Sequence, residues 1–132
     1  MSEENVDVMR RTEEALNSGD DEAVVETFDP DVVFEPQRAS VQGTYRGHDG
    51  VRDWLADTRE NFAAFRLFIT ERRDLGDDRV LSIGTLRFRG QGSGVETEVP
   101  TAAVVTLRNG KIVRLKDYGD RSKALEAAGL SE

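Results

Sequence analysis

The feature that most constrains the fold of this chain is an Asn-Gly dipeptide between two β-type runs. Residues 101–107 are rich in β-branched and apolar side chains, Asn109-Gly110 follows closely, and a second run of the same kind covers 111–118. Both central residues of a type I′ turn need positive φ, so this arrangement predicts a two-residue β-hairpin. The hairpin would fix the register of both strands and, with it, the direction in which Asp117 points.

The remainder of the chain predicts helices in the first half and strands in the second. Apolar spacing predicts a helix ended by Gly19, a second one capped by Asp20 and stopped by Pro30, and a third from about His48. Phe28 is assigned to the apolar face of the second helix, and Phe62 and Phe65 to that of the third. The predicted strands cover 32–34, 66–75, 79–89, 95–107 and 111–118, with a loop over 37–47 and a short helix or ordered tail near 124–128.

Helices followed by an antiparallel meander indicate the α+β class. A strongly bent sheet with helices on one face would form a cone with an interior cavity. A chain of 132 residues predicts one domain covering 1–132.

Composition excludes several classes of function. The formal net charge of −8 argues against nucleic acid or anionic membranes as partners, because both need clustered Lys and Arg. The chain has no cysteine and a single histidine, His48, which argues against a thiol nucleophile and against a His-based zinc site. The start of the chain is acidic and no apolar run approaches membrane-spanning length. We expect a cytoplasmic protein without metal or cofactor.

Four stretches together resemble the nuclear transport factor 2-like (NTF2-like) superfamily, in particular its SnoaL-like polyketide cyclase and ketosteroid isomerase branches. They are Ala-Leu-Asn-Ser-Gly-Asp at 15–20, Phe-Asp-Pro-Asp-Val-Val-Phe-Glu-Pro at 28–36, Tyr-Arg-Gly-His-Asp-Gly-Val at 45–51 and Asn-Gly-Lys-Ile-Val at 109–113. The resemblance covers nearly the whole chain. It implies a conical α+β barrel, with three N-terminal helices packed on a strongly curved antiparallel sheet, an apolar pocket beneath them, and a homodimer formed through the sheet.

The resemblance also argues against the isomerase mechanism. Isomerases of this superfamily use a tyrosine seven residues before the Gly-Asp pair, where this chain has Thr12, and an acid two residues after the proline that aligns with Pro100, where it has Ala102. Both oxyanion donors are therefore missing, and such a loss can cost about 10²–10³ in rate. The general base of the isomerases lies just before a proline on the first strand; it matches Glu35 if one residue is deleted, whereas an ungapped alignment places Pro36 there. SnoaL-like cyclases rely on an acid on a late strand, the region of Asp117.

Two carboxylates are candidates for acid/base chemistry. Asp117 follows Val113 and Leu115 at a period of two, so it faces the core if they do. The alternative is an ion pair at the rim with a neighbouring Arg or Lys. Glu35 shares a face with Val33 and would reach the pocket if Val33 points inward; otherwise it ends its strand in solvent.

Other residues are candidates for binding a ligand. Arg87 interrupts an apolar strand and would orient an oxygen-rich ligand or hold Asp117; the alternative is an exposed face or a dimer contact. Tyr45 lies in the predicted loop, which could cover the mouth of the pocket. Its hydroxyl could donate a hydrogen bond to a ligand there. Trp54, Phe62 and Met9 are expected in the core or lining the pocket, and the positions of Thr12 and Ala102 are added from the resemblance.

Two functions stay open on the sequence. The first is a protein that binds a small, mostly apolar, oxygenated ligand in the pocket without chemistry. The second is a cofactor-independent acid/base enzyme, a cyclase, isomerase or hydratase, using Asp117 with Glu35 or Arg87.

Overall fold

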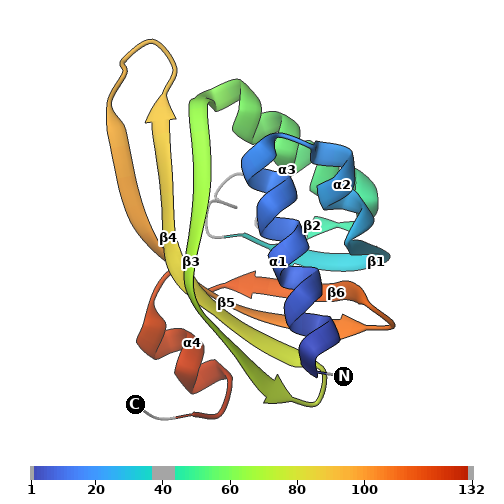
Figure 1. Ribbon diagram of the computed structural model, residues 1–132. Coiled ribbons are helices and arrows are strands. Elements are labelled where there is room, and N and C mark those ends of the chain that lie inside the picture. Colours follow the sequence, from blue (N-terminus) through green and yellow to red (C-terminus); the bar gives the residue numbers. More distant parts are fainter. Residues whose placement is uncertain (1, 37–43, 131–132) are drawn as a thin grey trace.

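The computed structural model describes residues 2–36 and 44–130, so residues 37–43 of the predicted loop lie outside the described part. The helices and strands appear in Figure 1 in the order α1 (Ser2–Ser18), α2 (Asp21–Glu26), β1 (Phe28–Glu35), β2 (Tyr45–Arg46), α3 (Gly47–Asn61), β3 (Phe62–Gly76), β4 (Arg79–Gly90), β5 (Glu96–Arg108), β6 (Lys111–Asp117) and α4 (Arg121–Ala127). The α+β class predicted from the sequence is confirmed.

The strands form one sheet in the order β2-β1-β6-β5-β4-β3. The predicted hairpin joins β5 to β6, and Asn109 and Gly110 both have positive φ, 53° and 74°. Strands β3 to β6 form the expected antiparallel meander. The sheet is not antiparallel throughout, however, because β1 runs parallel to β6. That pairing joins segments far apart in the chain, and short-range patterns carry no signal for it.

The long strands β3 and β4 bend over the helices, as Figure 1 shows. The pairing register of β3 shifts between Ile69 and Glu71, opposite Gly84 of β4. A Cβ atom at position 84 would lie 2.8 Å from the Cα of Ile69 and closer still to the carbonyl oxygen of Phe68. Only glycine therefore lets the two backbones approach at this bulge, which bends the sheet into a concave surface.

Helices cover the two faces of the sheet unequally. The helix α1 crosses the concave face, with α2 and α3 beside it, and α4 lies on the outer side of the sheet (Figure 1). The main core lies between the sheet and the first three helices. A second, smaller core joins Leu81 and Ala102 to Ala124 and Leu125 of α4. Ala102 belongs to this smaller core, whereas its neighbour in β5, Ala103, belongs to the main core.

Three parts of the predicted secondary structure are wrong. Phe28, assigned to the second helix, begins β1, and Pro30 lies inside that strand, in a stretch where the pairing with β6 is interrupted and no N–H is needed. Phe62 and Phe65, assigned to the third helix, lie in β3, because the chain turns extended at Phe62. Tyr45, predicted in a loop, lies in β2.

Candidate functional site

A cavity of about 470 Å³ lies between the concave face of the sheet and the helices. Its wall is mostly apolar, and its aromatic side chains come from β1, β2, α3 and β3: Phe28, Phe34, Tyr45, Trp54, Phe62 and Phe65. The Trp54 ring packs edge-on against Phe34 and Phe65, with centroids 5.2 and 5.9 Å apart. The volume is in the range of pockets that bind small molecules.

Polar groups of the cavity follow one row across the sheet. Arg72 of β3 is the register partner of Ser82 in β4, Ser82 is that of Ala103 in β5, and Ala103 is that of Asp117 in β6. All four residues line the cavity, and so does Thr101, two positions before Ala103. The row gives an apolar cavity a floor with hydrogen-bonding groups.

Arg72 enters the cavity because of the bulge in β3. Phe65, Leu67 and Ile69 line the cavity at a period of two, which would place residue 71 next. The register shift after Ile69 reverses the alternation, so Arg72 points inward and Glu71 does not. Arg72 was not predicted as a site residue, because a bulge of this kind leaves no periodic signal in the sequence before the strands are paired.

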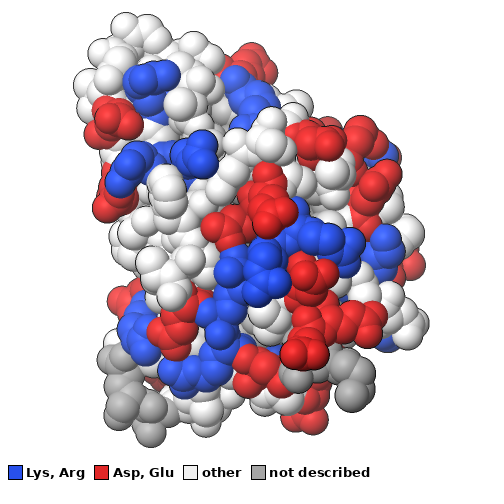
Figure 2. All heavy atoms as spheres, viewed as in Figure 1, with Lys and Arg blue, Asp and Glu red and all other residues white. Residues whose placement is uncertain are grey.

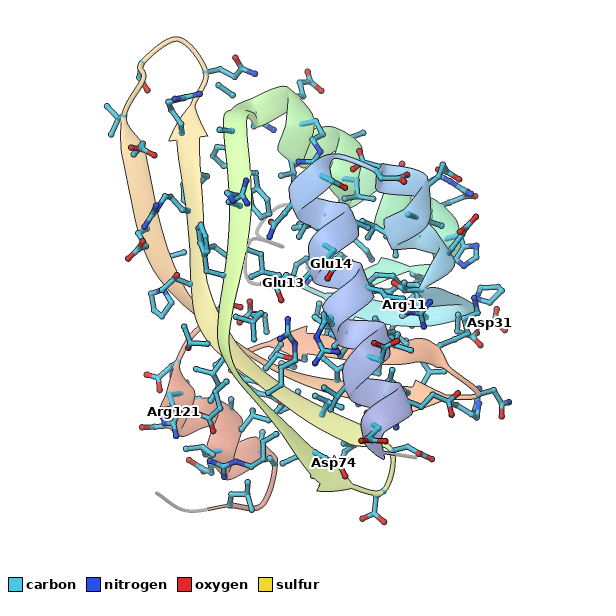
Figure 3. The ribbon with its side chains drawn as sticks, viewed as in Figure 1. Arg11, Glu13, Glu14, Asp31, Asp74 and Arg121 are labelled. Carbon is cyan, nitrogen blue, oxygen red and sulfur yellow. The ribbon has the colours of Figure 1, made fainter. Side chains whose placement is uncertain are left out.

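Arg72 forms an ion pair with Glu13, which projects from α1 toward β3 (Figure 3). The two side chains are only 18% and 19% exposed, and Oε2 of Glu13 also lies 3.3 Å from the Ile69 backbone N–H that donates to it. Burial lowers the pKa of the Arg72 guanidinium, and nearby Arg10 lowers it further. An arginine nevertheless stays protonated in proteins, so Arg72 keeps its positive charge beside Glu13.

Two buried polar atoms of this floor have no hydrogen-bond partner among the described residues. They are Nε of Arg72 and Oγ of Ser82, a residue that is 4% exposed. Most buried polar groups in proteins are paired, so two unpaired ones on neighbouring strands, both in one cavity wall, need an explanation. No sequence pattern marks Ser82, which stands within a strand of apolar residues.

Asp117 lines the cavity as the alternation predicted, beside Leu115. Its Oδ2 accepts a hydrogen bond from the Thr101 hydroxyl, and its Oδ1 accepts from the backbone N–H groups of Ala102 and Gly119 at 3.0 and 2.9 Å. A carboxylate has about four lone-pair sites, so most of its accepting capacity is already used. The contacts join the end of β6 to β5.

Glu35 does not line the cavity. The alternation in β1 places Phe34 on the cavity side, so Val33 and Glu35 face the other way, and the conditional prediction that Glu35 enters the pocket fails. Its side chain is 25% exposed, with one carboxylate oxygen 3.4 Å from the Thr44 hydroxyl and the other 3.6 Å from Arg114.

Arg87 and Ala102 also lie outside the cavity. Arg87 is exposed, donates to Glu98 at 2.8 Å and stands over the ring of Phe68. Of the two predictions for Arg87, the structure therefore shows the exposed face and not a contact with Asp117. Ala102 is buried against α4 on the outer side of the sheet. The position inferred from the resemblance therefore faces away from the cavity, and its neighbours Thr101 and Ala103 face in.

The remaining predicted ligand-binding residues, Met9, Thr12, Tyr45, Trp54 and Phe62, all line the cavity. The Thr12 hydroxyl is already bonded, 2.8 Å from the carbonyl oxygen of Val8 and 2.9 Å from the Thr27 hydroxyl. Burial, followed by the charges of Asp57 and Asp53, raises the pKa of Tyr45, which keeps its hydroxyl protonated.

Within residues 2–36 and 44–130, no three acidic, His or Cys side chains gather in a way that could hold a metal ion. None of the helices in the same ranges has the length and apolarity needed to cross a membrane.

Comparison with known proteins identifies the family. The SnoaL-like domain matches residues 9–115. An uncharacterised protein of Mycobacterium tuberculosis is 30% identical over 115 residues, which are 86% of this chain and 87% of that protein. An NTF2-like protein of unknown function from Burkholderia pseudomallei superposes with a TM-score of 0.79 at 25% identity, covering 93% of this chain and 95% of its own. TerC, crystallised with polyporic acid, superposes with a TM-score of 0.78 at 24% identity over 96% of this chain and 98% of its own.

The fold is thus the NTF2-like cone shared by polyketide cyclase-like and ketosteroid isomerase-like proteins, as the sequence predicted. Within that class, the chain belongs to the SnoaL-like domain family.

Proposed function

We propose that this protein binds a small, mostly apolar, oxygenated molecule in the cavity under its helices, without catalysing a reaction on it. The observation that carries the proposal is the cavity itself, about 470 Å³ with an aromatic wall and a short row of polar groups. Such a space suits an apolar body with one or two oxygen atoms, because every buried polar group of a ligand needs a partner.

The chain offers its own probe for this test. Trp54 is the single tryptophan and it lines the cavity, so its fluorescence reports on ligand entry. A set of alicyclic and aromatic ketones, alcohols and hydrocarbons, with polyporic acid included because TerC was crystallised with it, would be titrated into the protein. We expect at least one compound to change Trp54 emission and to bind stoichiometrically in calorimetry. No binding by any compound up to millimolar concentration would contradict the proposal.

Acid/base catalysis by Asp117 is the second candidate, and its support is that the carboxylate lies in the cavity wall. Glu35 and Arg87, the partners predicted for it, lie outside that wall. If Asp117 is the acid or base, Asp117→Asn should abolish turnover of a cyclisation, isomerisation or hydration substrate while the variant still binds it. Unchanged turnover in the variant would remove Asp117 from the mechanism.

We further propose a cytoplasmic homodimer that binds neither nucleic acid nor membranes. The net charge of −8 supports the last point, and so does the face in Figure 2, where basic side chains lie among acidic ones. Light scattering at micromolar concentration should give twice the mass of 14.7 kDa; a monomer mass would contradict the dimer. Cell fractionation tests the location.

A further inference from the structure

We infer that Arg72 Nε and Ser82 Oγ form a binding site for a carbonyl oxygen, and that the site selects an uncharged carbonyl compound over a carboxylate. The inference rests on the proposed function, since it names the chemical class that the cavity would take.

Nε of Arg72 needs a hydrogen-bond acceptor. An arginine Nε–H can only donate, so its partner must be an acceptor. Glu13 pairs with the terminal Nη2 of the same guanidinium, and no other described residue pairs with Nε. A buried donor without a partner is costly, and a ligand oxygen that reaches it removes that cost on binding.

Ser82 is the register partner of Arg72 on the neighbouring strand and lines the same cavity. Its hydroxyl also has no partner among the described residues. A serine hydroxyl rotates and can donate in any direction that its side chain allows. A carbonyl oxygen has two lone pairs and no hydrogen of its own, so one such atom can accept from both residues. A ligand hydroxyl would bring a further hydrogen in need of a partner.

The charge of the cavity wall also favours a neutral ligand. Among residues 2–36 and 44–130, its ionisable side chains other than Tyr45 are Glu13, Asp57, Asp117 and Arg72, three acids and one base. Glu13 already compensates the charge of Arg72, and the other two acids add negative charge. A ligand carboxylate would be repelled, whereas a neutral carbonyl needs only the two donors.

Three naphthalenes of nearly the same shape test the inference. 2-Acetylnaphthalene carries the carbonyl, 2-isopropenylnaphthalene replaces its oxygen by CH₂, and 2-naphthoate is charged. We expect the wild-type protein to bind the ketone roughly tenfold more tightly than the hydrocarbon, and more tightly than the carboxylate, in calorimetry or competition experiments. Equal affinity for ketone and hydrocarbon, or preference for the carboxylate, would overturn the inference.

Variants assign the preference to the two residues. Ser82→Ala should reduce the advantage of the ketone about fivefold without weakening the hydrocarbon, and it should leave the thermal midpoint unchanged or raised, because the hydroxyl has no partner in the part of the chain that the structure describes. Arg72→Lys keeps the charge opposite Glu13 but lacks Nε, and it should reduce the same advantage. Thr27→Val is the matched control, since that hydroxyl is equally buried and already bonded to Val24 and Thr12 but does not line the cavity. It should lower the thermal midpoint and leave the ketone advantage intact.

The outcomes separate this inference from the proposed function. If the ketone and the hydrocarbon both bind and Ser82→Ala leaves the ratio of their affinities unchanged, the cavity is a ligand site but Ser82 does not recognise the carbonyl. The inference is then wrong. If a water molecule in the cavity already bonds to both groups, the ketone and the hydrocarbon will bind with equal affinity. The inference is then also wrong. If neither compound nor any other binds, the proposed function fails and the inference fails with it.

Discussion

At the scale of single residues, the polar groups of the cavity differ in whether the protein already satisfies them. Thr12 and Asp117 have partners within the protein, whereas the hydroxyl of Ser82 and Nε of Arg72 have none within residues 2–36 and 44–130. A satisfied group holds the fold together, while an unsatisfied group is available to a ligand. The distinction separates a structural role for Asp117 from a recognition role for Ser82, although both line the same wall.

Replacing Asp117 tests its structural role. Asp117→Ala removes an acceptor of three hydrogen bonds and leaves two backbone N–H groups and the Thr101 hydroxyl unpaired. We expect the free energy of unfolding to fall by about 2–4 kcal/mol, measured by urea denaturation. Asp117→Asn keeps one oxygen acceptor and should cost roughly half as much. A loss below about 0.5 kcal/mol for the alanine variant would show that these contacts do not hold β6 to β5.

At the scale of secondary-structure elements, the bulge in β3 determines what enters the cavity. Before it, apolar side chains point inward at a period of two; after it, the alternation is reversed and Arg72 points inward. The helix α1 supplies Glu13 opposite that position (Figure 3). One extra residue in a strand thus converts an apolar wall into one with a partly buried ion pair.

Gly84 is the position on which the bulge depends. Gly84→Ala would place a Cβ against the backbone of Phe68 and Ile69, which cannot move aside as a flexible side chain could. We expect a loss of about 3 kcal/mol or more in the free energy of unfolding, by urea denaturation. Gly92→Ala is the control, because its Cβ would meet nothing and only its positive φ of 76° is strained, at about 1–2 kcal/mol. Equal losses in both variants would contradict a steric role for Gly84.

The attachment of α4 to the sheet should depend on pH. Arg121 of α4 and Arg73 donate to the Glu71 carboxylate at 2.6 and 2.8 Å, and these hydrogen bonds, Arg121 first, hold the pKa of Glu71 below its ordinary value of 4.5. A carboxyl whose pKa is lower in the folded state stabilises the fold above its unfolded pKa. That stabilisation is lost as the pH falls through the folded pKa.

Glu71→Gln tests this dependence. The wild type should be more stable than the variant near pH 7, by no more than about 1 kcal/mol because the side chain is 31% exposed. The difference should shrink as the pH falls below about 4.5. Thermal denaturation of both proteins between pH 3 and 7 measures it. A difference that grows toward acid pH would contradict the assignment.

At the scale of the whole molecule, the sheet separates two interiors with different properties. The concave side encloses the cavity, and the outer side, under α4, is closely packed around Leu81 and Ala102. Two adjacent residues of β5 face different interiors: Ala103 faces the cavity, and Ala102 faces α4. Substitutions at these two positions therefore probe the two interiors separately.

This separation predicts opposite results for two matched substitutions. Ala103→Leu should fill part of the cavity, leave the free energy of unfolding within about 1 kcal/mol of the wild type, and abolish the binding of 2-acetylnaphthalene. Ala102→Leu overfills a site that is 1% exposed, so it should cost about 1–3 kcal/mol and leave binding intact. Denaturation and calorimetry on both variants measure these effects. Undiminished binding in Ala103→Leu would place the ligand elsewhere.

Much of the fold could be predicted from local pattern. Asn109-Gly110 predicts its hairpin through backbone sterics, and apolar periodicity predicts α1, most of α3 and the meander strands. The predictions for Phe28, Phe62 and Phe65 were wrong because an apolar aromatic fits a helix face and a strand equally well. Alternation from Leu115 placed Asp117 correctly, since β6 has no bulge between those residues.

The α+β class, the hairpin and the aromatic residues of the pocket follow from the sequence, because turn chemistry and hydrophobic period act over a few residues. The family follows from the resemblance of four short stretches. Which polar groups share the cavity depends on the tertiary structure. Glu13, Arg72, Ser82 and Asp117 come from α1, β3, β4 and β6, and they meet through strand register, a bulge at Gly84 and the crossing of α1. Those relations depend on pairing between distant segments, which no local pattern encodes.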